Sequence, residues 1–207
     1  MQKLLITDYD AVVLADGDFP SADIPLRLLR EAPYVVCCDG ASRSWPQADA
    51  IIGDGDSVPA ELRHRLILVS EQDDNDLTKA TRHCMNEGHR RIVYLGATGR
   101  REDHTLGNIA LLARYRREFG LTPLMATDHG WFVPASGSAE FSTFPGQQVS
   151  LFNLTCTRLS SEGLKWNTYP YQQFWQGTLN EALSDTFRID ADGDYLVFRT
   201  YEKKIKG

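Results

Sequence analysis

The chain has 207 residues, 42% of them hydrophobic, which is enough for one large domain or two small ones with buried cores. Its formal net charge of −6, without a block of Lys or Arg, excludes the usual electrostatic footprint of a nucleic-acid-binding protein. No apolar run reaches the length of a membrane span and the N-terminus lacks a signal-peptide pattern, so we expect a soluble protein that does not act at a membrane.

The first 130 or so residues alternate between apolar runs of strand length and stretches of helical periodicity, which is typical of βαβ units and a mostly parallel sheet. The predicted strands are 11–15, 34–38, 50–52, 66–69, 91–95 and 123–126. The predicted helices are 25–31, 59–64, 76–87 and 105–119. The two cysteines at 37 and 38 are adjacent in one of these strands, and the other two lie at 84 and 156. Without paired spacing, they indicate reduced, buried thiols and a cytoplasmic location.

Aspartates follow two of these apolar runs, which we expect to be buried strands. Asp54 and Asp56 lie in a Gly-containing loop after 50–52, and Asp73 and Asp76 follow 66–69. The carboxyl ends of parallel strands meet at one edge of a sheet, where ligands of α/β proteins bind. Because Mg²⁺ prefers oxygen ligands and phosphates, the pattern indicates a magnesium site for a nucleotide substrate, although turn or cap aspartates are an equally ordinary use.

A second candidate segment, Gly96–His104, lies between a strand and a long helix, where free backbone N–H groups favour an anion. Arg101 is placed to clamp phosphate oxygens, and Asp103 either caps the helix or contacts the ligand. Asn108 shares a helix face with His104. Lys79 follows Asp76 by three residues and meets either a phosphate or Asp76. Neither a GxxxxGK[ST] nor a GxGxxG motif is present, which disfavours P-loop and dinucleotide-binding proteins.

After about residue 130 the helical periodicity fades, and short β-rich segments such as 148–152 and 195–199 are divided by Gly and Asp turns. This pattern predicts an antiparallel β-sandwich. We therefore expect an α/β fold in which a mostly parallel sheet domain, residues 1–130, is followed by a β-sandwich domain, residues 131–207.

Taken in order, these segments resemble the thiamine pyrophosphokinase family over nearly the whole chain. The matching segments in the first half are Asp16–Pro20, Asp39–Ala41, Gly53–Ser57, Asp73–Ala80, and Gly96–His104 with Asn108. Those in the second half are Gly146–Leu151, Gly163–Trp166 and Gly177–Glu181. The resemblance implies transfer of a pyrophosphoryl group from ATP to thiamine, with Mg²⁺ as cofactor. It also implies a homodimer, an N-terminal domain for nucleotide, Mg²⁺ and catalysis, and a C-terminal domain for thiamine and dimerisation.

The resemblance also implies a role for individual residues. Asp54, Asp56, Asp73 and Asp76 would hold Mg²⁺ and act in catalysis with Arg101. The nucleotide would lie against Asp39, Gly40, Ser57, Lys79, Thr98, Gly99, Asp103, His104 and Asn108. Thiamine would lie against Trp166, Thr178 and Asn180.

The chain departs from the family at two positions. Arg100 stands where the family usually has a second glycine, beside the proposed phosphate loop, and Leu179 stands where it often has serine. The first departure bears on nucleotide preference, and the second on a hydroxyl contact to thiamine. Two other functions fit the same carboxylates: a Mg²⁺-dependent pyrophosphokinase or hydrolase with another acceptor, and a nucleotide or thiamine sensor without activity.

Overall fold

The computed structural model describes residues 8–71 and 73–203, and it divides the chain into two compact units that separate between Asp128 and His129. All four cysteines are free and buried, as predicted. Among the described residues, no helix combines the length and apolar character needed to cross a membrane.

The first unit contains a parallel sheet with the strand order β6-β5-β1-β2-β3-β4. Its strands are β1 (Ala11–Leu14), β2 (Val35–Cys38), β3 (Ala50–Gly53), β4 (Leu66–Leu68), β5 (Arg91–Leu95) and β6 (Thr122–Ala126). Every residue of β1, β2 and β3 is buried, because these central strands are covered on both faces. The prediction of a mostly parallel α/β sheet is therefore confirmed.

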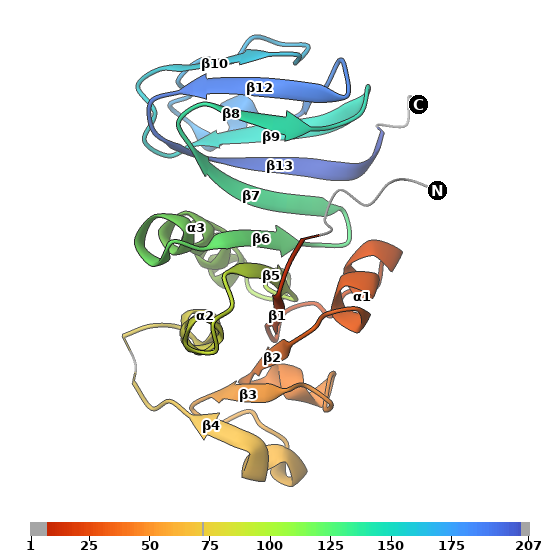
Figure 1. Ribbon diagram of the computed structural model, residues 1–207, viewed down its shortest axis with the longest axis vertical. Coiled ribbons are helices and arrows are strands. Elements are labelled where there is room, and N and C mark those ends of the chain that lie inside the picture. The colour runs from red at the N-terminus through yellow and green to blue at the C-terminus, as the bar shows by residue number, and fades with distance from the viewer. Residues whose placement is uncertain (1–7, 72, 204–207) are drawn as a thin grey trace. The chain divides into compact units, whose positions relative to one another are not determined.

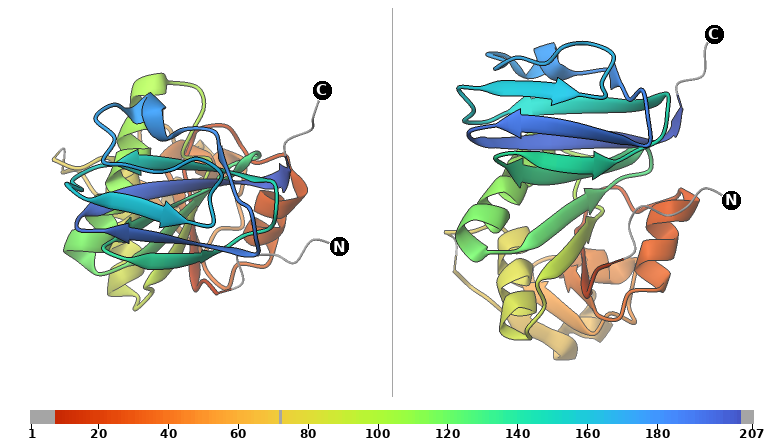
Figure 2. Two further views of the ribbon diagram at one scale, coloured as in Figure 1. Left: turned by 90° about the horizontal axis from the view of Figure 1, so that it is seen from above. Right: turned by 45° about the horizontal axis from the view of Figure 1, so that its top comes forward.

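The helices of this unit are α1 (Asp23–Arg30), α2 (Asp76–Asn86) and α3 (Glu102–Phe119). Helix α1 lies on one face of the sheet, and α2 and α3 lie on the other, as Figures 1 and 2 show. Asn75 caps α2, since its side-chain oxygen accepts a hydrogen bond from the Thr78 N–H at 3.0 Å. Helix α3 ends at Gly120, whose left-handed φ of 65° favours glycine.

Two local predictions about this unit are wrong. The predicted helix at 59–64 is a 3₁₀ helix, η2 (Ala60–Arg65), and none of its residues is buried, so no packing stabilises a longer α-helix. Strand β4 is not buried either: Ile67 is 44% and Leu68 is 64% exposed. It is the edge strand and pairs only with β3 among the described strands.

The second unit is an antiparallel sandwich. One set of strands has the order β11-β9-β13-β7, and the other has the order β10-β12-β8. The strands are β7 (Gly130–Ser136), β8 (Ala139–Ser142), β9 (Gln147–Asn153), β10 (Leu159–Glu162), β11 (Asn180–Glu181), β12 (Thr186–Ala191) and β13 (Asp194–Lys203). A short 3₁₀ helix, η3 (Phe174–Gly177), precedes β11.

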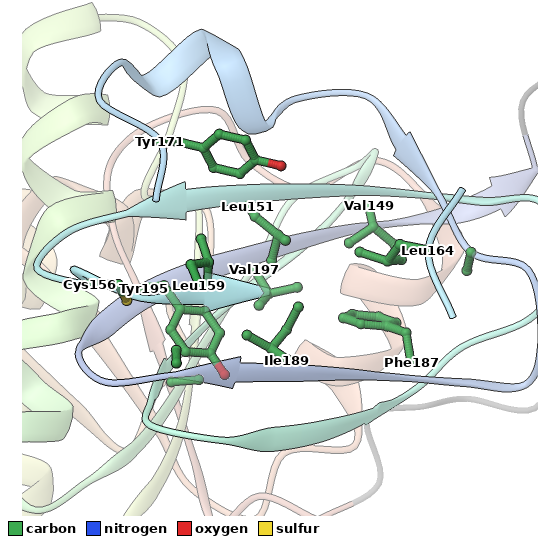
Figure 3. Packing of buried hydrophobic residues seen from close by; sticks show 13 residues of the cluster. Val149, Leu151, Cys156, Leu159, Leu164, Tyr171, Phe187, Ile189, Tyr195 and Val197 are labelled. Carbon is green, nitrogen blue, oxygen red and sulfur yellow. The ribbon is translucent and has the colours of Figure 1, made fainter. Parts of the chain in front are cut away.

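The core of the sandwich lies between these two layers. Figure 3 shows Val149 and Leu151 of β9 facing Phe187 and Ile189 of β12, with Val197 of β13 between them. These residues alternate with more exposed ones along β12, as expected for strands with one buried face. The predicted sandwich fold of the second half is confirmed.

Candidate functional site

Several loops meet at the carboxyl edge of the parallel sheet. Gly17, after β1, donates a backbone hydrogen bond to the carbonyl oxygen of Gly96 at 2.7 Å, and Asp18 donates to that of Thr98 at 2.9 Å. A Cβ atom at Gly17 would collide with both of these carbonyl oxygens, so the close approach requires glycine. The loop after β1 and the loop after β5 are thus joined along their backbones.

Three carboxylates gather beside these loops. Asp39, Asp54 and Asp56 each offer one oxygen atom, and these three atoms lie within 4.8 Å of one another. Asp39 begins the 3₁₀ helix η1 (Asp39–Arg43), directly after β2. A Cβ atom at Gly53 would lie 2.8 Å from the Asp39 Cβ atom, so glycine at the end of β3 lets Asp39 pack there.

Asp39 is the buried member of this cluster, with 5% of its surface exposed. Its Oδ2 atom accepts a hydrogen bond from the Ser57 N–H at 3.3 Å, while its Oδ1 atom is buried without a hydrogen-bond partner. Burial is the main cause that raises the pKa of Asp39 to about 6; the hydrogen bond from the Ser57 N–H acts against it, and the neighbouring carboxylates of Asp56 and Asp76 act with it. A buried, unpartnered carboxylate oxygen is costly unless a cation satisfies it.

Asp56 and Ser57 form the exposed side of the cluster. The Ser57 hydroxyl donates to Asp56 Oδ1 at 2.7 Å, and this bond lowers the pKa of Asp56. Ser57 does not cap the following 3₁₀ helix, whose N-cap is Pro59. Arg43 donates from Nη2 to the Ser57 carbonyl oxygen at 3.0 Å, which brings a cation to this side.

The aspartates after β4 divide into different environments. Asp76 pairs with the buried Lys79, whose Nζ lies 3.1 Å from its Oδ1 atom. Asp74 binds Arg82 and Arg114, the latter at 2.7 Å, and so ties this loop to α2 and α3. Asp73 is exposed. Among the described residues, the 4.8 Å cluster includes Asp39 and excludes Asp73 and Asp76, although we predicted the latter two as metal ligands.

The loop Gly96–Arg101, which we call the phosphate loop, carries two arginines. Arg101 binds Asp103 with two hydrogen bonds, from Nε at 3.1 Å and from Nη2 at 2.6 Å. These bonds raise the pKa of Arg101 and lower that of Asp103 to about 2. Asp103 is not the helix cap, because α3 begins at Glu102 and Arg101 occupies the N-cap position. The predicted phosphate clamp is therefore paired with a carboxylate in the free protein.

The amide of Asn108 connects this loop to α2. Asn108 donates to the carbonyl oxygen of Ala97 at 2.8 Å and accepts a hydrogen bond from the Asn75 side chain at 3.0 Å. His104 lies in the first turn of α3 and is exposed. Thr98 and Gly99 lie within the phosphate loop, and Gly40 directly follows Asp39 at the start of η1.

In the second unit, Trp166 and Asn180 form a reciprocal pair. The Asn180 side chain accepts from the Trp166 N–H at 3.1 Å and donates to its carbonyl oxygen at 2.8 Å. Asn180 is buried, whereas Trp166 is 52% exposed and has the Lys165 Nζ 4.9 Å from its ring centroid. Thr178 donates from its hydroxyl to the Trp175 carbonyl oxygen at 2.7 Å. The pair holds the backbone of Trp166, and its half-exposed indole has the Lys165 ammonium over the ring.

Two charged residues at the edge of the sheet were not among the predicted site residues. Asp16 lies at the end of β1 and contacts the start of η1, and Arg43 lies at the end of η1. The signal for Asp16 is present in the sequence, since Asp16-Gly17 follows a strand in the same way as Asp39-Gly40. Arg43 has no such signal, because only the 3₁₀ turn brings it to Ser57.

Two family models match this chain. The model described as "Thiamin pyrophosphokinase, catalytic domain" matches residues 26–121. The model described as "Thiamin pyrophosphokinase, substrate-binding domain" matches residues 130–198. The comparison with curated proteins finds no match.

Solved structures of similar fold carry the same description. Thiamine pyrophosphokinase from Bacillus subtilis is 17% identical, with a TM-score of 0.74, and the match covers 92% of this chain and 99% of that one. The Candida albicans enzyme is also 17% identical, with a TM-score of 0.74 and coverage of 93% and 90%. Yeast thiamin pyrophosphokinase is 15% identical, with a TM-score of 0.76 and coverage of 95% and 88%. At these identities the likeness shows a shared fold.

Proposed function

The chain belongs to the thiamin pyrophosphokinase family, and we propose that the carboxylates of Asp39, Asp54 and Asp56 form the centre at which it acts. The enzyme transfers a pyrophosphoryl group from ATP to the hydroxyl of thiamine and releases AMP. The observation that carries the proposal is the buried, unpartnered Oδ1 atom of Asp39 beside two exposed carboxylates.

The residues of this cluster fit Mg²⁺. They provide hard oxygen donors from three separate positions, and one donor lacks any other partner. The exposed sides of Asp54 and Asp56 leave room for the water and phosphate ligands that Mg²⁺ retains. When bound, Mg²⁺ would neutralise charge on the phosphate oxygens. Asp73, in the loop before α2, and Asp76, at the start of α2, supply further oxygen ligands through bridging water in this proposal.

The other residues of the edge bind and orient the nucleotide. Backbone N–H groups of the phosphate loop, including those of Thr98 and Gly99, donate to phosphate oxygens in this proposal, because a loop before a helix N-terminus favours an anion. Arg101 exchanges its pairing with Asp103 for phosphate oxygens, to which its planar guanidinium is equally suited. Asn108 joins the phosphate loop to the N-cap of α2 through its two side-chain hydrogen bonds. Lys79 neutralises the charge of Asp76. His104, in the first turn of α3, and Ser57, in the loop after β3, lie next in sequence to these segments.

Bond changes in the transfer are those of an in-line displacement at the β-phosphorus of ATP. The bond from the thiamine oxygen to the β-phosphorus forms, and the bond from that phosphorus to the oxygen shared with the α-phosphorus breaks. The electron pair of the broken bond stays on AMP, and the hydroxyl proton leaves to a carboxylate of the cluster or to water. The protein contributes positioning and charge neutralisation, without a covalent intermediate.

Thiamine binds at the second unit in this proposal. The half-exposed indole of Trp166 stacks on the cationic thiazolium ring in place of the Lys165 ammonium, and the bonds to Asn180 hold the backbone of Trp166. Leu179 has a φ of 64° and is exposed, so it offers an apolar contact where a hydroxyl was expected from the family. Thr178, one residue earlier, still carries a hydroxyl, although that group is bonded to Trp175.

A second copy of the chain covers exposed apolar residues of the second unit. Trp175 is 72% exposed, and its exposed neighbours in sequence include Phe174 and Leu179. Such large exposed apolar side chains usually mark an interaction surface, and formation of a homodimer would bury them. Four free, buried cysteines agree with a reducing compartment, so we place the enzyme in the cytoplasm.

The direct test is incubation of the purified protein with thiamine, ATP and Mg²⁺, followed by chromatographic detection of thiamine diphosphate and AMP. We expect the two products in equal amounts and none after addition of EDTA. AMP release without thiamine would support a hydrolase, and nucleotide binding without AMP release would support a sensor. Neither alternative is favoured by a feature of the described residues.

A further inference from the structure

Arg100 occupies a backbone conformation that disfavours a side chain. Its φ is 55°, in the left-handed region, and it follows Gly99, whose φ is 79°. Only glycine adopts this region without steric cost, so an arginine persists here when its side chain makes compensating interactions. Such strain at a phosphate loop gives a reason to ask what the arginine does.

The Arg100 side chain crosses from the phosphate loop to the loop after β1. Its Nη1 atom donates to the carbonyl oxygen of Asp16 at 2.7 Å and lies 3.1 Å from the Asp16 Oδ1 atom. Two backbone hydrogen bonds join the same loops, from Gly17 to Gly96 and from Asp18 to Thr98. Arg100 therefore completes a set of contacts that holds the phosphate loop against the end of β1.

Asp16 carries this contact on to the carboxylate cluster. A Cβ atom at Gly40 would lie 3.0 Å from the Asp16 Cγ atom and closer still to its Oδ2 atom. Gly40 directly follows Asp39, the buried carboxylate of the cluster. The Asp16 carboxylate thus faces Arg100 with one oxygen and the start of η1 with the other.

The positive charge of Arg100 offsets negative charge near the proposed nucleotide site. Asp16 adds a further carboxylate beside a cluster that must receive a nucleotide polyphosphate. The other cations of the predicted site are already paired, Arg101 with Asp103 and Lys79 with Asp76. Arg100 is the residue that offsets Asp16, and its side chain remains 55% exposed. Without it, an unpaired carboxylate would repel the incoming phosphates.

We propose that Arg100 is a positioning residue for the nucleotide: it holds Asp16 and the phosphate loop together and offsets the Asp16 charge beside the polyphosphate. The inference rests on the proposed function, because it assigns the phosphate loop to ATP. It adds a positioning pair, Arg100 and Asp16, to the residues already assigned to the nucleotide.

The first test separates nucleotide affinity from turnover. Arg100→Ala is expected to raise KM for ATP about five- to tenfold, while kcat and KM for thiamine change less than about twofold. The matched control is Arg90→Ala, since Arg90 is also exposed and donates to backbone carbonyls, but at the start of β5. Unchanged KM for ATP in Arg100→Ala, or an equal rise in Arg90→Ala, would overturn the proposal.

A double-mutant cycle tests the partner. If Arg100 acts through Asp16, Asp16→Asn in the Arg100→Ala background restores part of the lost ATP affinity, because it removes the repelling charge. The effect of Arg100→Ala should also shrink at high salt, where the charges are screened. Arg100→Lys, which keeps the charge, should lie between wild type and Arg100→Ala. Strictly additive effects of the two substitutions would contradict the pairing.

Arg100→Gly distinguishes a functional role from a structural one. Glycine relieves the left-handed backbone, so the melting temperature should stay equal or rise, while KM for ATP still increases. A purely structural arginine would instead lower the melting temperature in step with affinity. If KM for ATP falls or stays unchanged in this variant, the inference fails.

A measurement without turnover keeps the inference separate from the proposed function. Hydrogen exchange of the Gly17 and Asp18 amides, which donate to the phosphate loop, should accelerate in Arg100→Ala and not in Arg90→Ala. Calorimetric titration with ATP and Mg²⁺ then gives the change in affinity directly. If wild type binds ATP but forms no thiamine diphosphate, the proposed function fails while these readouts still decide on Arg100. Equal amide hydrogen exchange and equal ATP affinity in wild type and Arg100→Ala would refute the proposed role of Arg100.

Discussion

Asp54 and Asp56 are the residues whose loss should affect activity most directly. Asparagine at either position keeps the size of the side chain and removes a charged oxygen ligand. We expect turnover to fall about 10²-fold or more for each variant, in line with the loss of an electrostatic group at a transition state. Folding should be unaffected because both side chains are exposed. Initial rates of thiamine diphosphate formation provide the measurement.

Asp185→Asn provides the matched control for these substitutions, because Asp185 is an exposed aspartate in the second unit. Its turnover should equal that of wild type. Near-normal rates in both Asp54→Asn and Asp56→Asn would refute their assignment.

Asp39 should destabilise the free protein at neutral pH. Its pKa is raised to about 6 in the folded state by burial, against about 3.9 in an unfolded chain. Well below pH 4 both states are protonated and the penalty is absent. Between about pH 4 and pH 6 the unfolded chain releases this proton while the folded state keeps it, so stability falls over this range and stays lower above pH 6, where the folded state buries the charge. Asp39→Asn should therefore be more stable than wild type at pH 8 in EDTA, and close to wild type at about pH 3.

Urea unfolding at the two pH values measures this difference. Added Mg²⁺ should stabilise wild type at pH 8 more than Asp39→Asn, because the variant keeps only the carboxylates of Asp54 and Asp56. If the free energy of unfolding of the two proteins depends on pH in the same way, the Asp39 carboxyl does not have a raised pKa in the folded state.

Local sequence patterns predict some of the site carboxylates and miss others. Asp54 and Asp56 could be predicted because Gly and Asp follow an apolar strand. Asp39 follows a strand in the same way, but its membership of the cluster depends on burial against Gly53, which no local pattern reports. Asp74 lies in the same short acidic segment as Asp73 and Asp76, yet it binds Arg82 of α2 and Arg114 of α3. Tertiary contacts decide which carboxylate is structural.

At the scale of elements, the N-terminus of α2 links stability to the site. Asn75 accepts from the Thr78 N–H and donates to Asn108 of α3, so its removal loses a cap and an interhelical bond. Asn75→Ala should lower the free energy of unfolding by about 1–2 kcal/mol. The measurement is the urea midpoint. Asn86→Ala, at the other end of the helix, is the control and should cost less than about 0.5 kcal/mol. Equal effects would contradict the cap.

Most elements of the first unit could be predicted, because periodicity and Gly or Asp turns mark them clearly. The errors lie where packing overrides periodicity. Residues 66–69 are apolar enough for a central strand, but their position at the sheet edge leaves Leu68 exposed. The predicted start of α3 was three residues late, because Glu102 and Asp103 were assigned to the loop although acidic residues favour a first helical turn.

At the scale of the whole molecule, the exposed apolar residues of the second unit predict a dimer. Sedimentation equilibrium should give twice the chain mass for wild type. Serine at both Trp175 and Leu179 removes much of this exposed apolar surface and should shift the protein toward monomer, with its circular dichroism unchanged. A wild-type monomer at all concentrations, or an unshifted double variant, would show that another partner covers these residues.

The fold of both halves could be predicted from alternation of strands and helices, followed by strands alone. The element that covers each buried face could not be predicted, because side-chain periodicity reports which face is buried and not what buries it. The same limit applies to thiamine: the Asn180 side chain binds the backbone of Trp166 in the second unit, but the sequence shows only that the two residues are fourteen positions apart.

The central claim is that the carboxylates at the edge of the sheet hold a divalent cation against the polyphosphate of ATP. Calorimetric titration of Mn²⁺, with and without an ATP analogue whose α,β-bridging oxygen is replaced by a methylene group, tests it most directly. We expect the analogue to strengthen Mn²⁺ binding to wild type, and the Asp54→Asn, Asp56→Asn double variant to lose at least about tenfold in affinity. Equal Mn²⁺ affinity in the two proteins with the analogue present would contradict the account.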